Sequence, residues 1–350
     1  MIKERIKNDG ADKAQGVEVA PGFTIEEMKA VFFDEHALRL PPYRVYRLDS
    51  EGYRYYYRFE EGGEAVFYPS VTTLLRNVMP TSPQLIDWML DNGKEQALEK
   101  RDLAAYYGTL MHMEFEKLII SRKYNFDLVP LTMRRFMEEN HLPEGFFNDN
   151  VNKLRKDVLS FAQFIKDYNV RPLAIEISLV HPDRRYAGCL DMPCVMTIKG
   201  KDVTAIVDFK SGRKGFWEEH ELQLHLYKEM WDYTFPDNPA ERVFNFSPKD
   251  WRKEPTYNLK DQTGSKAVEK LPALLALARI EDESRPDGLS VIRGEIDLDN
   301  FDTSKVITEM TLAELVKMGE NKPLDGADED EPIKPLFADE TPVKSKKTSK

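Results

Sequence analysis

The chain has 350 residues, enough for one large domain or two of ordinary size. Apolar residues make up 41% of it, which can support a hydrophobic core, and charged residues make up 32%. The formal net charge of −11 excludes a protein coated in basic surface, such as a histone-like binder, although a local basic groove can sit on an acidic body.

The two cysteines, Cys189 and Cys194, are too few for a disulfide framework or a four-cysteine iron–sulfur cluster. We interpret both as small buried residues in a reducing compartment. Residues 1–16 are polar and lack the apolar stretch of a secretory signal. No apolar run approaches the roughly 18 residues of a membrane span. The sequence therefore predicts a soluble, cytoplasmic protein.

The N-terminal part is predicted to be mainly helical. Residues 1–22 are expected to be flexible, and a capping box of Thr24 and Glu27 predicts a helix over 24–38. Residues 41–69 alternate aromatic and polar residues around a Gly-Gly pair, which indicates a β-hairpin. Apolar residues at helical spacing predict further helices over residues 69–79, 82–93, 95–123 and 148–169, with Gly108 inside the third or at a break in it.

The pattern changes after residue 172 to a run rich in Val and Ile. It predicts three strands, over residues 173–181, 187–198 and 202–210. A helix over 217–236 and strands over 241–248 and 256–261 are expected to follow. Helices before and after a central run of strands predict an α/β fold with a mixed β-sheet flanked by helices.

The C-terminal part gives weaker patterns. Residues 271–280 and 311–319 look like short helices, the second with a capping box of Thr311 and Glu314. The last residues are rich in Pro, Asp, Glu and Lys, which is typical of a disordered tail. The predicted organisation is a flexible N-terminus (1–22), one domain (23–318, core about 66–260) and a tail (319–350).

Polar residues stand in or beside strands that should be apolar: Glu176, Asp191, Asp208 and Lys210. Residues two apart in a strand point to the same face, so Asp208 and Lys210 are expected to project together. A turn at residues 199–202 would bring Asp191 alongside Asp208. Three carboxylates that converge on one point repel one another, so a cation must hold them.

Oxygen ligands without cysteine suit Mg²⁺ or Mn²⁺, and the carbonyl of Phe209 could add a neutral ligand. A lysine beside the metal would activate a water molecule or offset charge on a phosphate in the transition state. Hydrolysis of a phosphodiester needs these parts. For Asp208 and Lys210 alone, a plain salt bridge is the simpler interpretation; the other acidic positions favour the metal site.

Four short motifs occur in order: G-x-x-x-H with an acid one turn later, G-x-x-D, D-x-K and Q-x-x-x-Y. They occupy Gly108–His112 with Glu116, Gly188–Asp191, Asp208–Lys210 and Gln223–Tyr227. With "YPSVTTLL" and "LIDWML" upstream, the chain resembles the PD-(D/E)XK nuclease superfamily over roughly residues 66–260. Its likeness is to the RecB-like and CRISPR-associated exonuclease branch and to related phage exonucleases.

The resemblance implies a restriction-endonuclease-like core and a role for each matching residue. Asp191 and Asp208 would be the central metal ligands, and Lys210 the catalytic lysine. Glu176 would bind the metal or its water, and His112 would be an additional ligand.

Two further residues of the resemblance lie at i and i+4 on one helix. Gln223 and Tyr227 would support the lysine or contact the scissile strand. Glu116 would support His112 from one turn away, unless it is a plain surface acid. Many relatives in this branch hold an iron–sulfur cluster with four cysteines. This chain has two, so it looks more like the phage exonucleases without a cluster.

Two basic segments adjoin the acidic positions. Arg184 and Arg185 precede one of them, and Arg213, Lys214 and Trp217 follow the lysine. Such residues suit a DNA strand, because the cations meet phosphates and an aromatic ring can stack on a base. Ordinary solvated loops are the alternative. Alternation in a hairpin explains the interleaved Arg and Tyr of residues 44–58.

The sequence thus predicts a Mg²⁺- or Mn²⁺-dependent DNA exonuclease of phage or bacterial recombination or repair, in a bacterial cell or a phage-infected host. Two alternatives remain: a structure-selective or nicking endonuclease on the same scaffold, and a non-catalytic DNA-binding or assembly protein. A closed oligomer would favour the exonuclease. The acidic segment 325–340 with its "PLF" could dock on a recombination or replication protein, or could simply be a solvating tail.

Overall fold

The computed structural model describes most of the chain between residues 39 and 311. The described residues are 39, 41, 43–50, 53–59, 65–213, 215–283, 288–293, 298–299 and 307–311. The predicted flexible N-terminus, the predicted helix over 24–38 and the predicted tail lie outside them. The chain divides into two compact units, with the boundary between Arg285 and Pro286. The predicted single domain over 23–318 stays a prediction.

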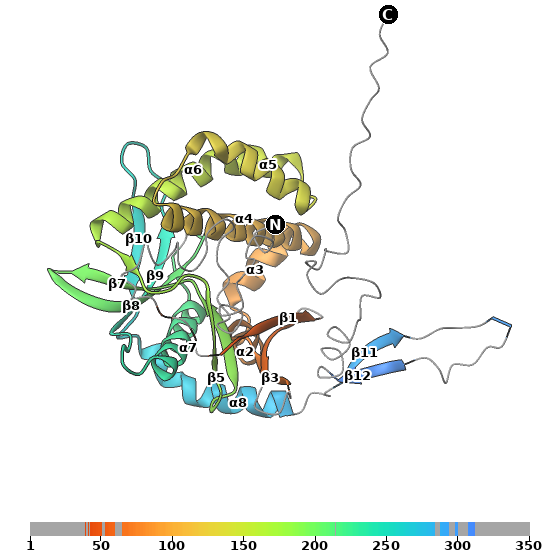
Figure 1. Ribbon diagram of the computed structural model, residues 1–350. Helices are drawn as coiled ribbons and strands as arrows, with labels where there is room; N and C mark the ends of the chain where they lie inside the picture. The colour runs from red at the N-terminus through yellow and green to blue at the C-terminus, as the bar shows by residue number, and fades with distance from the viewer. Residues whose placement is uncertain are drawn as a thin grey trace, which may run out of the picture. The chain divides into compact units, whose positions relative to one another are not determined.

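A five-stranded mixed sheet is the framework of the first unit (Figure 1). Its strand order is β10-β9-β8-β7-β4. β8 runs parallel to β9, whereas β7–β8, β4–β7 and β9–β10 are antiparallel pairs. The strands are β4 (Arg171–Pro172), β7 (Met192–Ile198), β8 (Lys201–Phe209), β9 (Arg242–Pro248) and β10 (Tyr257–Asp261). The predicted mixed α/β architecture is confirmed.

Three helices cover one face of this sheet (Figure 1). Val207 and Phe209 of β8 point into this layer, where Phe115 and Phe161 stack with ring centroids 4.1 Å apart. The helices are α4 (Lys94–Ser121), α5 (Val129–Glu139) and α6 (Glu144–Asp167), with the 3₁₀ turn η3 (Phe126–Leu128) between the first two. Burial of these aromatic side chains fixes α4 against the end of β8.

The opposite face packs on α7 (Glu218–Thr234), with α2 (Val71–Val78) and α8 (Leu271–Glu283) beyond it. Ile206 points to this side, toward a core that includes Leu226 and Trp231. Because side chains alternate along a strand, Asp208 also faces α7. Neighbouring side chains of β8 therefore contact helices on opposite faces of the sheet.

Two small antiparallel sheets lie beside this framework. One holds β1 (Tyr46–Ser50), β2 (Tyr53–Phe59) and β3 (Ala65–Pro69), and the other holds β5 (Ile177–His181) and β6 (Tyr186–Leu190). A bridge between Ser70 and Ala187 joins them. The predicted hairpin over 41–69 is thus a three-stranded sheet, one face of which buries Tyr56 and Tyr68.

The predicted helices within the described residues are confirmed, with ends that differ by a few positions. They are α2, α3 (Pro83–Asn92), α4, α6, α7 and α8, and the 3₁₀ turn η4 (Lys266–Lys270) precedes the last. Gly108 lies inside α4 without a break. The sequence analysis missed α5, although its buried residues Val129, Met133, Phe136 and Met137 recur at helical spacing.

Two strand predictions are wrong at the place that matters for the site. The predicted strand 187–198 is interrupted at Asp191: β6 pairs with β5, whereas β7 pairs with β8. The predicted strand 173–181 begins only at Ile177, because Leu173 and Ala174 donate their N–H groups to the carbonyl of Pro193. Hydrogen bonds to other segments therefore override the local β-propensity.

The second unit contains a two-stranded antiparallel sheet of β11 (Gly288–Arg293) and β12 (Ile307–Thr311). Thr311 ends β12, so its predicted place as a helix cap is wrong, and the rest of the predicted helix 311–319 lies outside the described residues. Across the described parts of both units, every helix is too short or too polar to traverse a lipid bilayer.

Candidate active site

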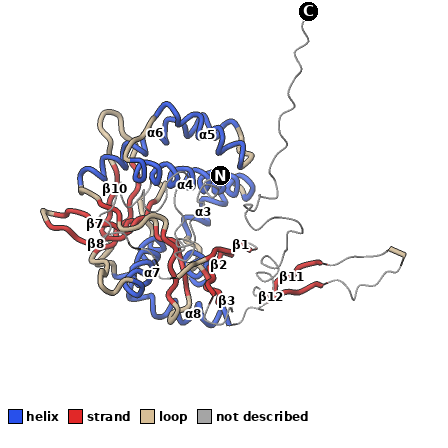
Figure 2. The backbone as a smooth tube through the Cα atoms, in the orientation of Figure 1, coloured by secondary structure: helices blue, strands red, loops and turns tan. Residues whose placement is uncertain are grey.

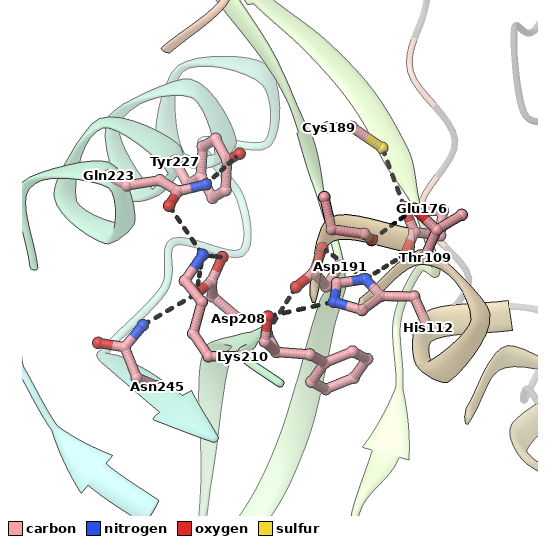
Figure 3. A network of polar contacts seen from close by, with 12 residues as sticks. Thr109, His112, Glu176, Cys189, Asp191, Asp208, Lys210, Gln223, Tyr227 and Asn245 are labelled. Carbon is pink, nitrogen blue, oxygen red and sulfur yellow. Dashed lines mark hydrogen bonds and ion pairs between the residues drawn. The ribbon is translucent and has the colours of Figure 1, made fainter. Parts of the chain in front are cut away.

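Three side chains that could hold a metal ion meet beside the end of β8. His112 comes from α4, Glu176 from the segment before β5, and Asp191 from the junction of β6 and β7. One ligand atom from each lies within 4.8 Å of the others. His112 Nδ1 is 3.3 Å from Glu176 Oε1 and 3.6 Å from Asp191 Oδ1 (Figure 3). We call these residues the acid–histidine cluster.

The strand interruption places Asp191 in this cluster. Its Oδ2 accepts a hydrogen bond of 2.5 Å from the backbone N–H of Phe209, and its carbonyl accepts one of 2.9 Å from the N–H of Glu176. Glu176 has a φ of 47°, in the left-handed region that few side-chain-bearing residues adopt. Such strain persists only where surrounding contacts impose it, and it often marks a functional position.

Both ring nitrogens of His112 face oxygen acceptors. Nε2 lies 3.1 Å from the carbonyl of Phe209, opposite the Nδ1 contact with Glu176. Burial lowers the pKa of His112, but the charge of Asp191 and the bond to Glu176 outweigh it and raise that pKa to about 9. Burial raises the pKa of Asp191, and Asp208 and Glu176 add to this against the opposing effect of His112. A divalent cation would relieve this crowding of carboxylates.

Asp208 and Lys210 form a second group on the α7 side of β8, as their two-residue spacing predicts. Lys210 Nζ lies 2.9 Å from Asp208 Oδ2 and donates a 2.9 Å hydrogen bond to Gln223 Oε1. Gln223 in turn donates to the hydroxyl of Tyr227 at 2.7 Å, which bears out their predicted common helix face. Asp208 does not belong to the acid–histidine cluster, whose ligand atoms come from the three residues above.

The sequence analysis missed Asn245, which lies beside Asp208 in the register of β8 and β9. This fully buried amide donates a 2.9 Å hydrogen bond to Asp208 Oδ2 (Figure 3). Its own oxygen accepts a 3.1 Å bond from Gln262, so the amide nitrogen is directed toward Asp208. The available signal was a lone Asn in the apolar run "RVFNFSP". Asn245 thus fixes the orientation of the carboxylate.

Gly188 of the G-x-x-D motif has a steric role. A Cβ atom placed there would lie 2.7 Å from the ring of Tyr227 and 3.1 Å from Met230. Only glycine therefore lets β6 approach α7 this closely. Gly188 thus leaves room for the Tyr227 ring, whose hydroxyl accepts the hydrogen bond from Gln223.

The remaining predicted site residues lie in different surroundings. Glu116 is half-buried one turn after His112 on α4. Arg184 pairs with Glu229 at 3.3 Å, and Arg185 lies in the β5–β6 turn, at the end of β6 away from Asp191. That separation is about five residues of strand, or roughly 17 Å. These two arginines therefore stand apart from the cluster.

Arg213 has a buried partner rather than a free surface position. Its guanidinium pairs with Asp157 of α6, which is fully buried and also accepts a 2.5 Å bond from Tyr107. It donates as well to the carbonyl of Pro248 at 2.9 Å. Lys214 lies outside the described residues, and Trp217 is 55% exposed at the start of α7. Of the two described residues, Arg213 and Trp217, Trp217 is the one whose side chain is open to a ligand.

Comparison with known proteins adds no family assignment. No protein-family model matches this chain, and no curated protein matches it. One solved structure with some likeness is the crystal structure of SSO0001, which is 16% identical and has a TM-score of 0.22. The match covers 51% of this chain and 85% of that one. At so low a TM-score the likeness carries no conclusion about fold or function.

Proposed function

We propose that this protein is a Mg²⁺- or Mn²⁺-dependent deoxyribonuclease with a restriction-endonuclease-like core, acting as an exonuclease in phage or bacterial recombination or repair. One observation carries the proposal: the acid–histidine cluster and the Asp208–Lys210 pair adjoin across Phe209. The resemblance of the motifs to PD-(D/E)XK nucleases supports the same assignment.

The donor set fits a divalent cation. An imidazole, two carboxylates and the nearby carbonyl of Phe209 are ligands that Mn²⁺ accepts and that Mg²⁺ accepts in part. His112, Glu176 and Asp191 would hold the ion, with Asp208 next to them. When bound, the ion would supply Lewis-acid stabilisation of phosphate charge and lower the pKa of an attacking water.

Lys210 would act on the phosphate from the α7 side. Its side chain is 20% exposed and its ammonium group is directed by Gln223 and Asp208, so little side-chain freedom remains to be lost. From this position it would donate a hydrogen bond to a phosphate oxygen as negative charge develops there. A salt bridge with only a structural role would need neither the Gln223–Tyr227 pair nor an adjacent cluster of acids.

The test is digestion of end-labelled linear DNA and closed circular DNA with Mg²⁺, with Mn²⁺ or with EDTA. Lys210→Ala is the test variant. Arg171→Ala is the matched control, because Arg171 also forms an ion pair, with Asp202, but at the end of β8 that lies away from Asp208. We expect metal-dependent digestion of linear DNA by the wild type and by the control, and none by Lys210→Ala.

Each other outcome has a defined meaning. Cleavage of closed circles would replace the exonuclease with an endonuclease. Full activity of Lys210→Ala would refute the assigned catalytic role. Absence of cleavage with either metal, on single and double strands, would refute the enzymatic proposal and favour a DNA-binding or assembly protein.

A further inference from the structure

Five cationic side chains gather on α6 and on the loop between β9 and β10, which runs beside that helix in Figure 2. We call them the basic ledge; they are Lys153, Lys156, Lys249, Arg252 and Lys253. None of them belongs to the site described above. The three loop residues and Lys156 are exposed, and Lys153 is half-buried.

The loop that carries the ledge is anchored. Trp251 donates its indole N–H to Ser160 Oγ at 3.0 Å, and Lys156 donates to the carbonyl of Trp251 at 3.1 Å. The backbone N–H of Lys249 donates to the carbonyl of Thr256 at 3.1 Å, which closes the base of the loop. Arg252 and Lys253 are therefore displayed from a fixed backbone, which lowers the entropic cost of binding a ligand.

The ledge begins at the edge of the sheet that carries Lys210. β8 and β9 are parallel, with Asp208 beside Asn245, and the N–H of Lys210 donates to the carbonyl of Phe246 at 2.8 Å. The loops that follow the two strands therefore leave the sheet at the same end. Arg213 links those two loops through its bond to the carbonyl of Pro248.

The helical part of the ledge lies on α6 and contacts α4. Lys153 Nζ lies 3.7 Å from the ring centroid of Tyr107. Tyr107 precedes His112 by five residues, which is about 7.5 Å along the helix. The contact with Tyr107 therefore places Lys153 near the site, and the other ledge residues lie farther along α6 and in the β9–β10 loop.

The charges of the ledge have no ion-pair partners within the described part of the chain. Asp250 lies among them but pairs with Arg213 at 3.5 Å, and Glu254 follows without a salt bridge to any of the five. Burial lowers the pKa of Lys153 and the charge of Arg213 lowers it further, against the opposing charges of Asp157 and Asp250. This concentration of positive charge stands in a protein whose net charge is −11. An anionic ligand would relieve the repulsion.

We infer that the basic ledge binds the sugar–phosphate backbone of a DNA strand on one side of the scissile bond. The inference rests on the proposed function, because that function puts a phosphodiester at the edge where the ledge begins. Ledge contacts to phosphates give affinity that does not depend on base sequence and that weakens as salt displaces the ligand. Trp217 is not required for it.

The experiment measures DNA binding without catalysis. Fluorescence anisotropy of labelled single- and double-stranded oligonucleotides is recorded in EDTA, at KCl concentrations from about 50 to 250 mM. The variant is Arg252→Gln/Lys253→Gln. The matched control is Lys199→Gln/Lys201→Gln, which removes the same charge from exposed lysines at the β7–β8 turn. That turn lies roughly 24 Å along β8 from Asp208.

We expect the ledge variant to bind about tenfold more weakly or worse at low salt. Its slope of log Kd against log salt should fall by about 1.4 to 1.8, which corresponds to two lost phosphate contacts. The control should match the wild type. Equal losses in both variants, or no loss in either, would overturn the inference.

The two proposals fail in different ways. If the wild type cleaves DNA but the ledge variant binds as tightly as the control, the ledge inference fails and the nuclease stands. If neither the wild type nor a variant cleaves DNA, but only the ledge variant loses DNA affinity and salt dependence, the proposed nuclease function is refuted and the ledge inference stands.

Discussion

Replacing Asn245 by leucine tests whether orientation of Asp208 is a separate requirement of the site. The amide and the leucine side chain are similar in size, so the change removes polar contacts more than volume. It deletes the 2.9 Å hydrogen bond to the Asp208 carboxylate and the 3.1 Å bond from Gln262, which is 2% exposed. A bond to a charged group contributes about 1.5–3 kcal/mol, and a neutral bond about 0.5–1.5 kcal/mol.

Leucine regains part of this free energy through apolar burial, so we expect a net loss of about 1–3 kcal/mol in the free energy of unfolding. Such a loss leaves a domain of ordinary stability folded. Asp208 would retain only Lys210 as a partner among the contacts described above. Loss of a residue that orients a ligand reduces activity or metal affinity by about 10- to 100-fold. We therefore expect a fall of that size in the metal-dependent cleavage rate, with DNA binding in EDTA unchanged.

The assays are urea unfolding followed by tryptophan fluorescence, and single-turnover cleavage over a series of Mn²⁺ concentrations. Ser247→Ala is the control, because Ser247 is equally buried two residues further along β9 and receives only a 3.4 Å contact from Asn258. The reasoning is refuted if Asn245→Leu cleaves DNA as fast as Ser247→Ala. It is also refuted if the loss of rate is matched by an equal loss of DNA affinity, since misorientation of Asp208 predicts a defect in catalysis.

Three further predictions follow from other parts of the site. Gly188→Ala should lower the free energy of unfolding by about 1–3 kcal/mol in urea unfolding, because the new methyl group overlaps the Tyr227 ring at 2.7 Å; an unchanged midpoint would contradict this. Mn²⁺ at about ten times its Kd should stabilise the wild type by about 1.4 kcal/mol, which is measured as a rise in Tm. Asp191→Asn should abolish that rise, and an equal rise in the variant would show that Asp191 is not a metal ligand. His220 lies in the first turn of α7, where its Nδ1 accepts a 3.3 Å hydrogen bond from the backbone N–H of Trp217. Burial lowers the pKa of His220 to about 4, and the charge of Lys210 adds to this. The stability associated with the neutral ring is therefore present above pH 6.5 and is lost as the pH falls toward 4. Between pH 6.5 and 4, the free energy of unfolding of His220→Gln should fall by about 3 kcal/mol less than that of the wild type, as measured by urea unfolding. Parallel curves of unfolding free energy against pH for the two proteins would show that His220 does not titrate in this way.

Features that depend on neighbours in the sequence were predicted well. The two-residue spacing of Asp208 and Lys210 placed both on one face of β8, and their ion pair confirms it. The i, i+4 spacing of Gln223 and Tyr227 placed them on one face of α7, and their hydrogen bond confirms it. Backbone periodicity determines such relations, because a strand repeats every two residues and a helix about every 3.6.

Two features that depend on distant partners were not predicted. Asp191 interrupts a run with strong β-propensity because its carboxylate accepts the N–H of Phe209, 18 residues away. The sequence indicates a surface cation at Arg213, whereas in the structure its guanidinium pairs with Asp157, 56 residues away on α6. A single sequence shows neither partner, because the first bond joins the β6–β7 junction to the end of β8 and the second joins the loop after β8 to α6.

Most helices and the mixed α/β class could be predicted from local sequence patterns alone, and the same patterns singled out the polar residues proposed for the site. Packing of the chain sets which of those residues meet: His112, Glu176 and Asp191 form one cluster with Asp208 beside it, Asn245 orients Asp208, and the two arginines of the β5–β6 turn lie away from the site. The physical reason is that composition and period are properties of short segments. The distance between two side chains, in contrast, is set by the packing of α4, α6 and α7 on opposite faces of one sheet.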